Sequence, residues 1–135
     1  MPYYSINNNP ILPGNLSRQS GVYIIYALNS DQTPKPINRI LKTDDRGILY
    51  IGQTTRQTFK DRLEMFRRVM NPGYLATAHS GALNLREIPA LRTRFPATDI
   101  YVEVLPNSNP KAEEERLIEQ YRQTFGEVPP LNGSK

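Results

Sequence analysis

The chain has 135 residues and a net charge of +4, and a chain of this length fits one domain with a core of its own. It contains no cysteine, which excludes disulfides, thiolate zinc sites and a cysteine nucleophile. Its apolar runs are too short to span a bilayer, and its first residues lack the basic-then-apolar order of a signal peptide, so we expect a cytoplasmic protein with no membrane partner.

The first predicted elements follow an N-terminal arm, residues 1–19, in which prolines interrupt any period. The runs 22–28 and 48–53 are β-branched and aromatic, which is typical of buried strands. The connection between them, 29–47, is rich in turn residues. We therefore expect an antiparallel hairpin with an enlarged tip.

Two helices are predicted next. Thr58 and Asp61 resemble a capping box, and apolar residues at helical spacing then continue to Met70, where an Asn-Pro-Gly sequence stops the helix. A shorter helix is expected to begin at Ser80 and to break near Pro89.

The last predicted elements are a strand and a long helix. Residues 99–105 alternate as a third strand. The helix takes Asn109 as N-cap and Pro110 as its first residue, and Gly126 ends it. The pattern predicts one α/β domain (α+β) over residues 20–135, with a small, three-stranded, mostly antiparallel sheet flanked by helices in the order ββααβα.

Glu114 is the carboxylate in the most unusual position. At 100° per residue it points within about 10° of the centre of the apolar stripe formed by Leu117, Ile118, Tyr121 and Phe125. A charge in line with a buried stripe is costly unless it is paired, hydrogen-bonded or bound to metal. The alternative is that the stripe opens to solvent in the first turns of the helix, where acids also suit the dipole.

An arginine and two tyrosines are further candidates. Arg62 lies about 70° from the apolar centre of its helix, but Arg67 flanks the other side equally well, and either could simply snorkel to water. Tyr23 and Tyr50 lie in the hairpin strands, where aromatic residues usually mean packing. Gly52 permits close approach by a ligand or by a neighbouring segment.

These residues form a pattern in chain order. Gly21-Val22-Tyr23, Tyr50-Ile51-Gly52-Gln53-Thr54, a helix arginine, a helix glutamate before Leu117-Ile118, and a closing Pro130-Leu131-Asn132 resemble the signature of the GIY-YIG nucleases. The resemblance runs from Gly21 to Asn132, and the two motif tyrosines are 27 positions apart, as in restriction-type members with an extended hairpin.

The resemblance implies a role for each matching residue. Tyr23 and Tyr50 match the two motif tyrosines, of which Tyr23 would orient or deprotonate the attacking water, and Arg62 would neutralise the phosphate. Glu114 matches the metal-binding glutamate for Mg²⁺ or Mn²⁺, and Asn132 the closing asparagine. His79 matches, more loosely, a histidine found before the second helix in some members. One departure is Phe66, which stands four residues after the arginine where members often have histidine.

The implied function is a metal-dependent endonuclease that hydrolyses DNA phosphodiester bonds by in-line attack of water. Residues 35–94 carry twelve Lys or Arg and five acids, which favours a polyanion-binding face, although a solvated surface gives the same pattern. The residues expected to contact nucleic acid are Lys35, Arg39, Lys42, Arg46, Arg56, Lys60 and Arg67. The DNA could be duplex or branched, and high specificity would need a homodimer or an added partner. The alternatives are a GIY-YIG-like module that binds nucleic acid without cutting it, and a structural or protein-interaction domain.

Overall fold

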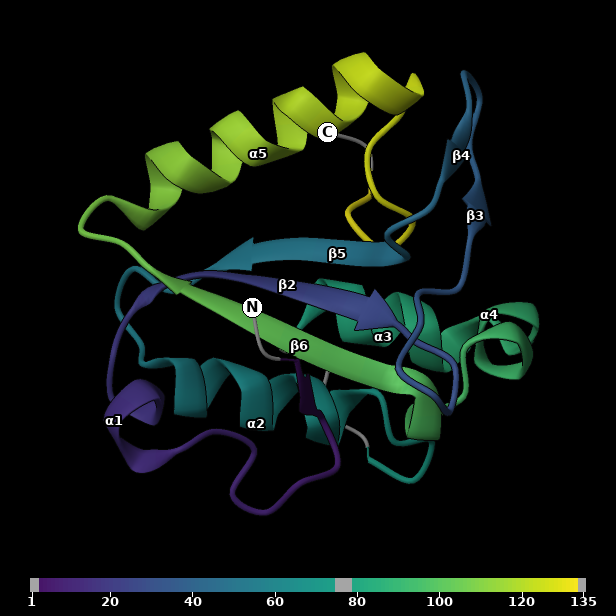
Figure 1. Cartoon of the computed structure of the whole chain (residues 1–135). Helices are drawn as coiled ribbons and strands as arrows, with labels where there is room; N and C mark the ends of the chain where they lie inside the picture. The colour runs from purple at the N-terminus through teal and green to yellow at the C-terminus, as the bar shows by residue number, and fades with distance from the viewer. Residues whose placement is uncertain (1–2, 75–78, 134–135) are drawn as a thin grey trace.

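The computed structural model describes residues 3–74 and 79–133, in which one sheet lies between two helical layers (Figure 1). Helix α5 covers one face of the sheet, and α2 and α3 cover the other. The elements in chain order are β1 (Tyr4–Ser5), α1 (Gly14–Ser17), β2 (Gly21–Ala27), β3 (Ile37–Asn38), β4 (Thr43–Asp44), β5 (Ile48–Gln53), α2 (Phe59–Val69), α3 (Ser80–Glu87), α4 (Pro89–Arg94), the 3-10 turn η1 (Ala97–Asp99), β6 (Ile100–Pro106) and α5 (Pro110–Phe125).

The fold is α+β with an antiparallel sheet, but the prediction of three strands was wrong. The sheet has four strands in the order β1-β6-β2-β5, and β3 and β4 form a separate two-stranded ribbon. The additional strand β1 pairs with β6, with Tyr4 opposite Val102. Each extra strand is two residues long, which is too short to produce a readable hydrophobic period.

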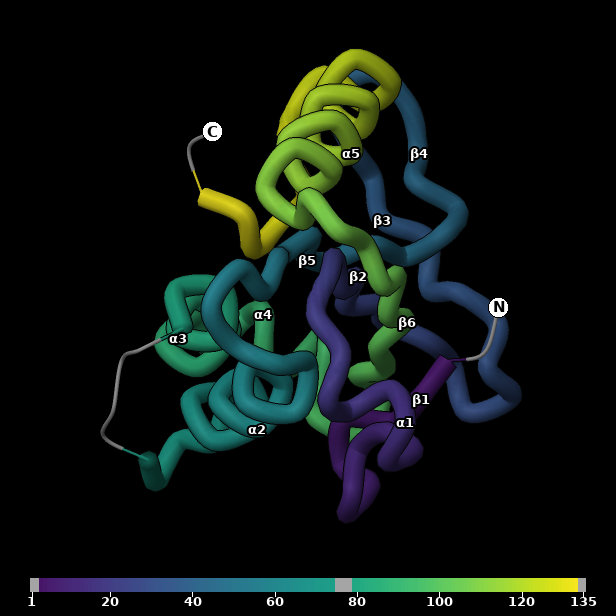
Figure 2. The backbone as a smooth tube through the Cα atoms, turned by 90° about the vertical axis from the view of Figure 1, so that its left-hand side faces the viewer, coloured from purple at the N-terminus to yellow at the C-terminus, as the bar shows by residue number. Residues whose placement is uncertain are grey.

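The alternation along β2 divides the core into two clusters. Tyr23 and Ile25 point into the cluster shared with α2 and α3, whereas Ile24 and Tyr26 point into the cluster shared with α5. Both faces are buried along the whole strand, which explains why its sequence is a continuous apolar run. Figure 2 shows the resulting layers, with α5 on one side of the strands and α2 and α3 on the other.

The helix ends follow their local signals, with one exception. The Thr58 side chain accepts a hydrogen bond from the Asp61 amide at 3.2 Å, as expected of an N-cap. Gly126 ends α5 with a φ of 83°, a left-handed conformation that favours glycine. The exception is Pro89, which ends α3 but also begins α4 as its first residue, where proline loses no hydrogen bond.

The long connection between β2 and β5 is anchored by a buried carboxylate. Asp44 accepts hydrogen bonds from the Arg46 amide at 2.8 Å, the Ile48 amide at 3.2 Å and the Tyr121 hydroxyl at 2.9 Å. The Arg39 guanidinium donates to the Val128 carbonyl at 2.6 Å. The ribbon is therefore held against the C-terminal end of α5, as Figure 1 shows.

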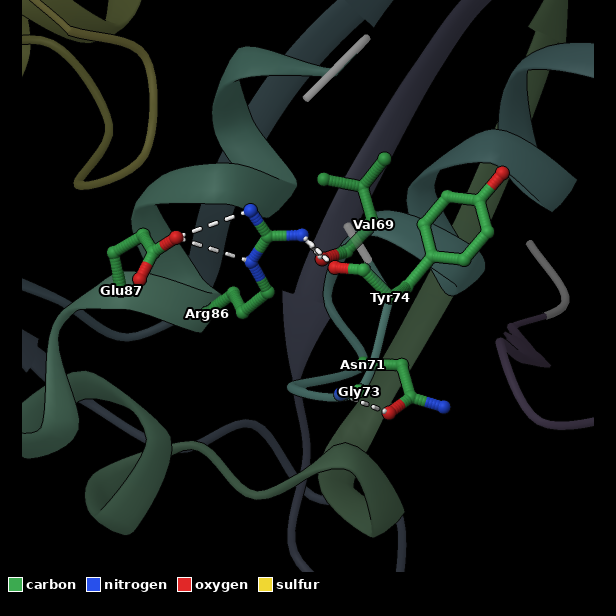
Figure 3. Close-up of polar contacts among 6 residues, drawn as sticks. All are labelled: Val69, Asn71, Gly73, Tyr74, Arg86 and Glu87. Carbon is green, nitrogen blue, oxygen red and sulfur yellow. Dashed lines mark hydrogen bonds and ion pairs between the residues drawn. The ribbon is translucent and has the colours of Figure 1, made fainter. Parts of the chain in front are cut away.

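A buried arginine joins helices α2 and α3 (Figure 3). Arg86 of α3 donates hydrogen bonds to the carbonyl of Val69, at the end of α2, and to the carbonyl of Tyr74. The other edge of its guanidinium donates a hydrogen bond to the Glu87 carboxylate. Arg86 satisfies a carbonyl that the end of a helix leaves without an intrahelical partner. The contact fixes how α3, and His79 at its start, sits on α2.

The N-terminal segment contributes to the same core. Ile6, Ile11 and Leu12 are buried in the cluster that contains Tyr23.

In the part of the chain that the structure describes, no helix is long and apolar enough to cross a membrane.

Candidate active site

The two motif tyrosines lie side by side on the sheet face that packs against α2 and α3. Their ring centroids are 6.0 Å apart, and both rings belong to the same core cluster. Tyr23 is 1% exposed, whereas Tyr50, on the outermost strand β5, is 8% exposed. Tyr50 is therefore the less deeply buried of the two phenols.

Two glycines make room for these rings. Tyr23 lies opposite Gly52 in the strand register, and a Cβ at Gly52 would lie 2.5 Å from the Tyr23 hydroxyl oxygen and 2.6 Å from the Tyr50 ring. A Cβ at Gly81 would lie 2.7 Å from the other edge of the Tyr50 ring. The glycine of the second motif is thus required by its own neighbouring tyrosines rather than by a ligand.

His79 joins the phenols from the start of α3. Its Nε2 lies 2.8 Å from the Tyr23 hydroxyl, and its Nδ1 accepts a hydrogen bond from the Ala82 amide at 3.2 Å. Its ring packs edge-on against Phe66, with centroids 4.9 Å apart. Phe66, one turn after Arg62 on α2, therefore packs against the histidine that reaches Tyr23.

Arg62 and Glu114 act on the same phenols from α2 and α5. Arg62 is hydrogen-bonded to Tyr23, and its charge favours the ionised forms of Tyr23 and Tyr50. Glu114, which is half-buried, disfavours both ionised forms. Tyr23, Tyr50 and Arg62 therefore lie together, and Glu114, on the helix that covers the opposite face of the sheet, is linked to them through its charge.

Burial dominates the protonation of the tyrosines. Desolvation raises the pKa of Tyr23 far above its ordinary value, and Tyr50 and Glu114 raise it further, against a lowering by Arg62. Desolvation likewise raises the pKa of Tyr50, against the lowering effects of Arg62 and of hydrogen bonds with Tyr23 and Ser80. Both phenols are therefore neutral at physiological pH in the free protein.

The buried histidine makes folding stability depend on pH. Burial lowers the pKa of His79 from 6.5 to about 3, so between these values it is protonated in the unfolded chain but not in the folded one. The unfolded state then binds more protons, and stability falls as the pH falls through this window. The unsubstituted protein should have a larger free energy of unfolding than the His79→Asn variant at neutral pH. We expect this difference to shrink by about 1.4 kcal/mol per pH unit below pH 6.5. Urea denaturation of both proteins at about pH 7 and about pH 5 measures this, and a constant difference would contradict it.

Asn132 has a different position from the other candidates. Its amide oxygen accepts from the Ile51 amide and its amide nitrogen donates to the Ile51 carbonyl, both at 2.9 Å. It pairs in this way with the free edge of β5, next to the phenols, as another strand would. The amide that was expected among catalytic groups is therefore engaged with the backbone, and it closes the edge strand.

The residues expected to contact nucleic acid differ in their availability. Lys35, Arg39 and Arg67 are ion-paired, to Asp99, Glu127 and Glu64 respectively. Lys42, Arg46, Arg56 and Lys60 are exposed. Arg56 precedes α2 and Lys60 lies in its first turn, two residues before Arg62, whereas Lys42 and Arg46 belong to the ribbon region at the C-terminal end of α5.

Two contributors were not identified from the sequence. Ser80 is hydrogen-bonded to Tyr50, and Gly81 makes room for the Tyr50 ring. Their only signal was the His79-Ser80-Gly81 sequence before the second helix. A serine and a glycine at a helix start ordinarily mean capping, so neither residue type indicates the tyrosine contact.

The available donor side chains limit how this region could hold the metal expected from the resemblance. Within residues 3–74 and 79–133, no group of three or more His, Cys, Asp or Glu side chains could hold an ion. Glu114 offers a single half-buried carboxylate, and Mg²⁺ in proteins commonly uses one or two carboxylates while keeping several waters. The donor set fits a hydrated divalent ion and does not fit a closed, all-protein metal cage.

Comparison with known proteins finds no relative of this chain. The chain matches no protein-family model, no curated protein and no solved structure.

Proposed function

We propose that the protein is a metal-dependent endonuclease of the GIY-YIG type that hydrolyses DNA phosphodiester bonds. The observation that supports it best is that Arg62 on α2 and Glu114 on α5 both act electrostatically on the buried pair Tyr23 and Tyr50 of β2 and β5. A set of tyrosines that served only as core would not need a guanidinium and a carboxylate brought to it, because burying charge is costly.

Each side chain has a task in this reaction. Arg62 would hold the phosphate and stabilise the charge that develops on it as the new P–O bond forms and the bond to the leaving oxygen breaks. The pair of phenols would orient the attacking water and the phosphate by hydrogen bonding, with Tyr50 as the more exposed of the two, since both are neutral in the free protein. Glu114 would hold a hydrated Mg²⁺ or Mn²⁺, which when bound supplies positive charge beside the phosphate and the leaving oxygen.

The surface is also suited to DNA. Arg56 and Lys60, both exposed, adjoin the helix that carries Arg62 and would contact phosphates on either side of the cleaved bond. A phosphodiester backbone is reached at a surface and requires no deep cavity. A groove of about 350 Å³ lies elsewhere, between α5 and the sheet, where Ile24, Ile51 and Leu117 contribute to its lining.

The test is incubation of the purified protein with supercoiled plasmid, linear duplex and branched DNA, with Mg²⁺ and with chelator. We expect nicked or linear products with Mg²⁺ and none with chelator. Salt-sensitive DNA binding without cleavage in any divalent ion would instead support the binding module, and the absence of DNA binding would reject both.

A further inference from the structure

The side chain of His79 has a fixed proton position. His79 is the only histidine in the chain, it is fully buried, and its Nδ1 faces the Ala82 amide at 3.2 Å. A backbone N–H can only donate, so Nδ1 must present its lone pair. The single proton of the neutral ring is then on Nε2, and Nε2–H donates to the Tyr23 hydroxyl at 2.8 Å.

The surrounding rings keep the imidazole in this orientation. Phe66 meets it edge-on at an interplanar angle of 84°, and the Tyr50 ring centroid is 5.1 Å away. Turning the ring over would place carbon atoms opposite the Ala82 amide and the Tyr23 hydroxyl. Both hydrogen bonds would be lost around a fully buried ring, so the alternative orientation is strongly disfavoured.

The proton on Nε2 determines where the Tyr23 proton can go. A phenol has one proton to donate and lone pairs to accept. His79 donates to the Tyr23 oxygen, and Arg62, which has no acceptor atom, also donates to it. The Tyr23 proton therefore points away from both, and the phenol beside it is Tyr50, whose ring centroid is 6.0 Å from that of Tyr23.

We propose that His79 is a positioning residue whose enforced tautomer sets the direction of a hydrogen-bond chain from His79 through Tyr23 to Tyr50. The Tyr50 hydroxyl, last in the chain and on the more exposed phenol, then directs its own proton at the bound phosphate or water. The role in cleavage rests on the proposed nuclease function, but the direction of the chain does not. Tyr23, whose oxygen is already fully hydrogen-bonded, acts through Tyr50.

Nuclear magnetic resonance tests the tautomer without any substrate. Because the chain has one histidine, a long-range ¹H–¹⁵N spectrum of labelled protein contains one imidazole pattern. We expect Nε2 to carry the proton and Nδ1 to have the shift of an unprotonated nitrogen, unchanged between about pH 8 and about pH 5. A proton on Nδ1, or an averaged pattern, would overturn the proposal whether or not the protein cuts DNA.

Two substitutions at His79 test the roles of its two ring nitrogens separately. His79→Asn places an amide where Nδ1 stands, so it keeps an acceptor for the Ala82 amide but cannot reach Tyr23. His79→Gln is long enough to place an N–H donor near the Nε2 position, but it gives up the cap. The pair therefore distinguishes a donor to Tyr23 from a mere helix cap.

The expected results are opposite for the two variants. His79→Asn should keep the denaturation midpoint better than His79→Gln, yet lose about 10- to 100-fold in kcat with KM for DNA little changed, as is usual when a supporting hydrogen bond is removed. His79→Gln should unfold more easily but keep most of kcat. Equal losses of kcat in both variants, or a wild-type kcat in His79→Asn, would overturn the proposal. Failure of the unsubstituted protein to cleave DNA would instead reject the proposed nuclease function, and the spectrum would still decide the direction of the chain.

Discussion

Gly52→Ala is expected to abolish cleavage, although it adds a single methyl group. The new Cβ would lie 2.5 Å from the Tyr23 hydroxyl oxygen and 2.6 Å from the Tyr50 ring, distances that real Cβ atoms essentially never show. Both phenols must therefore move. A displacement of about 1 Å in a catalytic group can cost about 100-fold in rate, and we expect at least that loss in single-turnover cleavage of plasmid.

The stability cost of Gly52→Ala is expected to be smaller than its effect on activity. Overpacking a core position costs about 1–3 kcal/mol, which a domain of this size tolerates, so the variant should still fold. Gly14→Ala is the matched control, because a Cβ at Gly14 has no atom within 4 Å. It should cleave at the rate of the unsubstituted protein. A folded Gly52→Ala variant with full activity would show that the tyrosine positions do not matter for cleavage.

Glu114→Gln is expected to reduce cleavage by about 100- to 1000-fold, the range found when one preorganised electrostatic contact in a catalytic site is removed. The amide keeps the shape of the side chain but loses the charge that would hold a divalent ion. DNA affinity measured in chelator should be equal or slightly higher, because a negative charge near the phosphate is removed. Single-turnover cleavage with Mg²⁺ and fluorescence-anisotropy binding in chelator measure the two effects separately.

The same substitution distinguishes two roles for Glu114. Its charge disfavours ionisation of Tyr23 and Tyr50, so its removal makes both phenols more acidic. If Glu114 only adjusted the phenols, Glu114→Gln would cleave as well as the unsubstituted protein or better. A large loss points instead to direct contact with the ion or the substrate.

The neighbouring Glu113→Gln is the matched control for Glu114→Gln. Glu113 lies one residue earlier on the same helix and is paired with Arg116 at 2.7 Å, a solvent-accessible pair of small energetic value. The Glu113→Gln variant should cleave DNA at the rate of the unsubstituted protein. A similar loss in both variants would mean that helix charge, rather than the position of Glu114, controls the rate.

The elements with a clear hydrophobic period were predictable from the sequence. β2 and β5 were expected within a residue of their observed bounds, and α2 and α5 begin and end where Thr58, Pro110 and Gly126 indicated. These features depend on short-range physics, namely the periods of strands and helices and the conformations of caps. The direction of Glu114 relative to the apolar stripe of its helix is a local property of the same kind.

The contacts among the site residues were decided by the tertiary structure. On α2 helical geometry left Arg62 and Arg67 equivalent, and only the motif pattern favoured Arg62; the docking of the helix brings Arg62 to the phenols and leaves Arg67 paired with Glu64. The position of Asn132 against Ile51 likewise depends on how the C-terminal segment returns to the edge of β5. The sequence by itself determined which faces of the helices and strands are apolar, because that follows from local geometry. Only the packing of those faces, which joins residues far apart in the chain, decided which charged groups meet at Tyr23 and Tyr50.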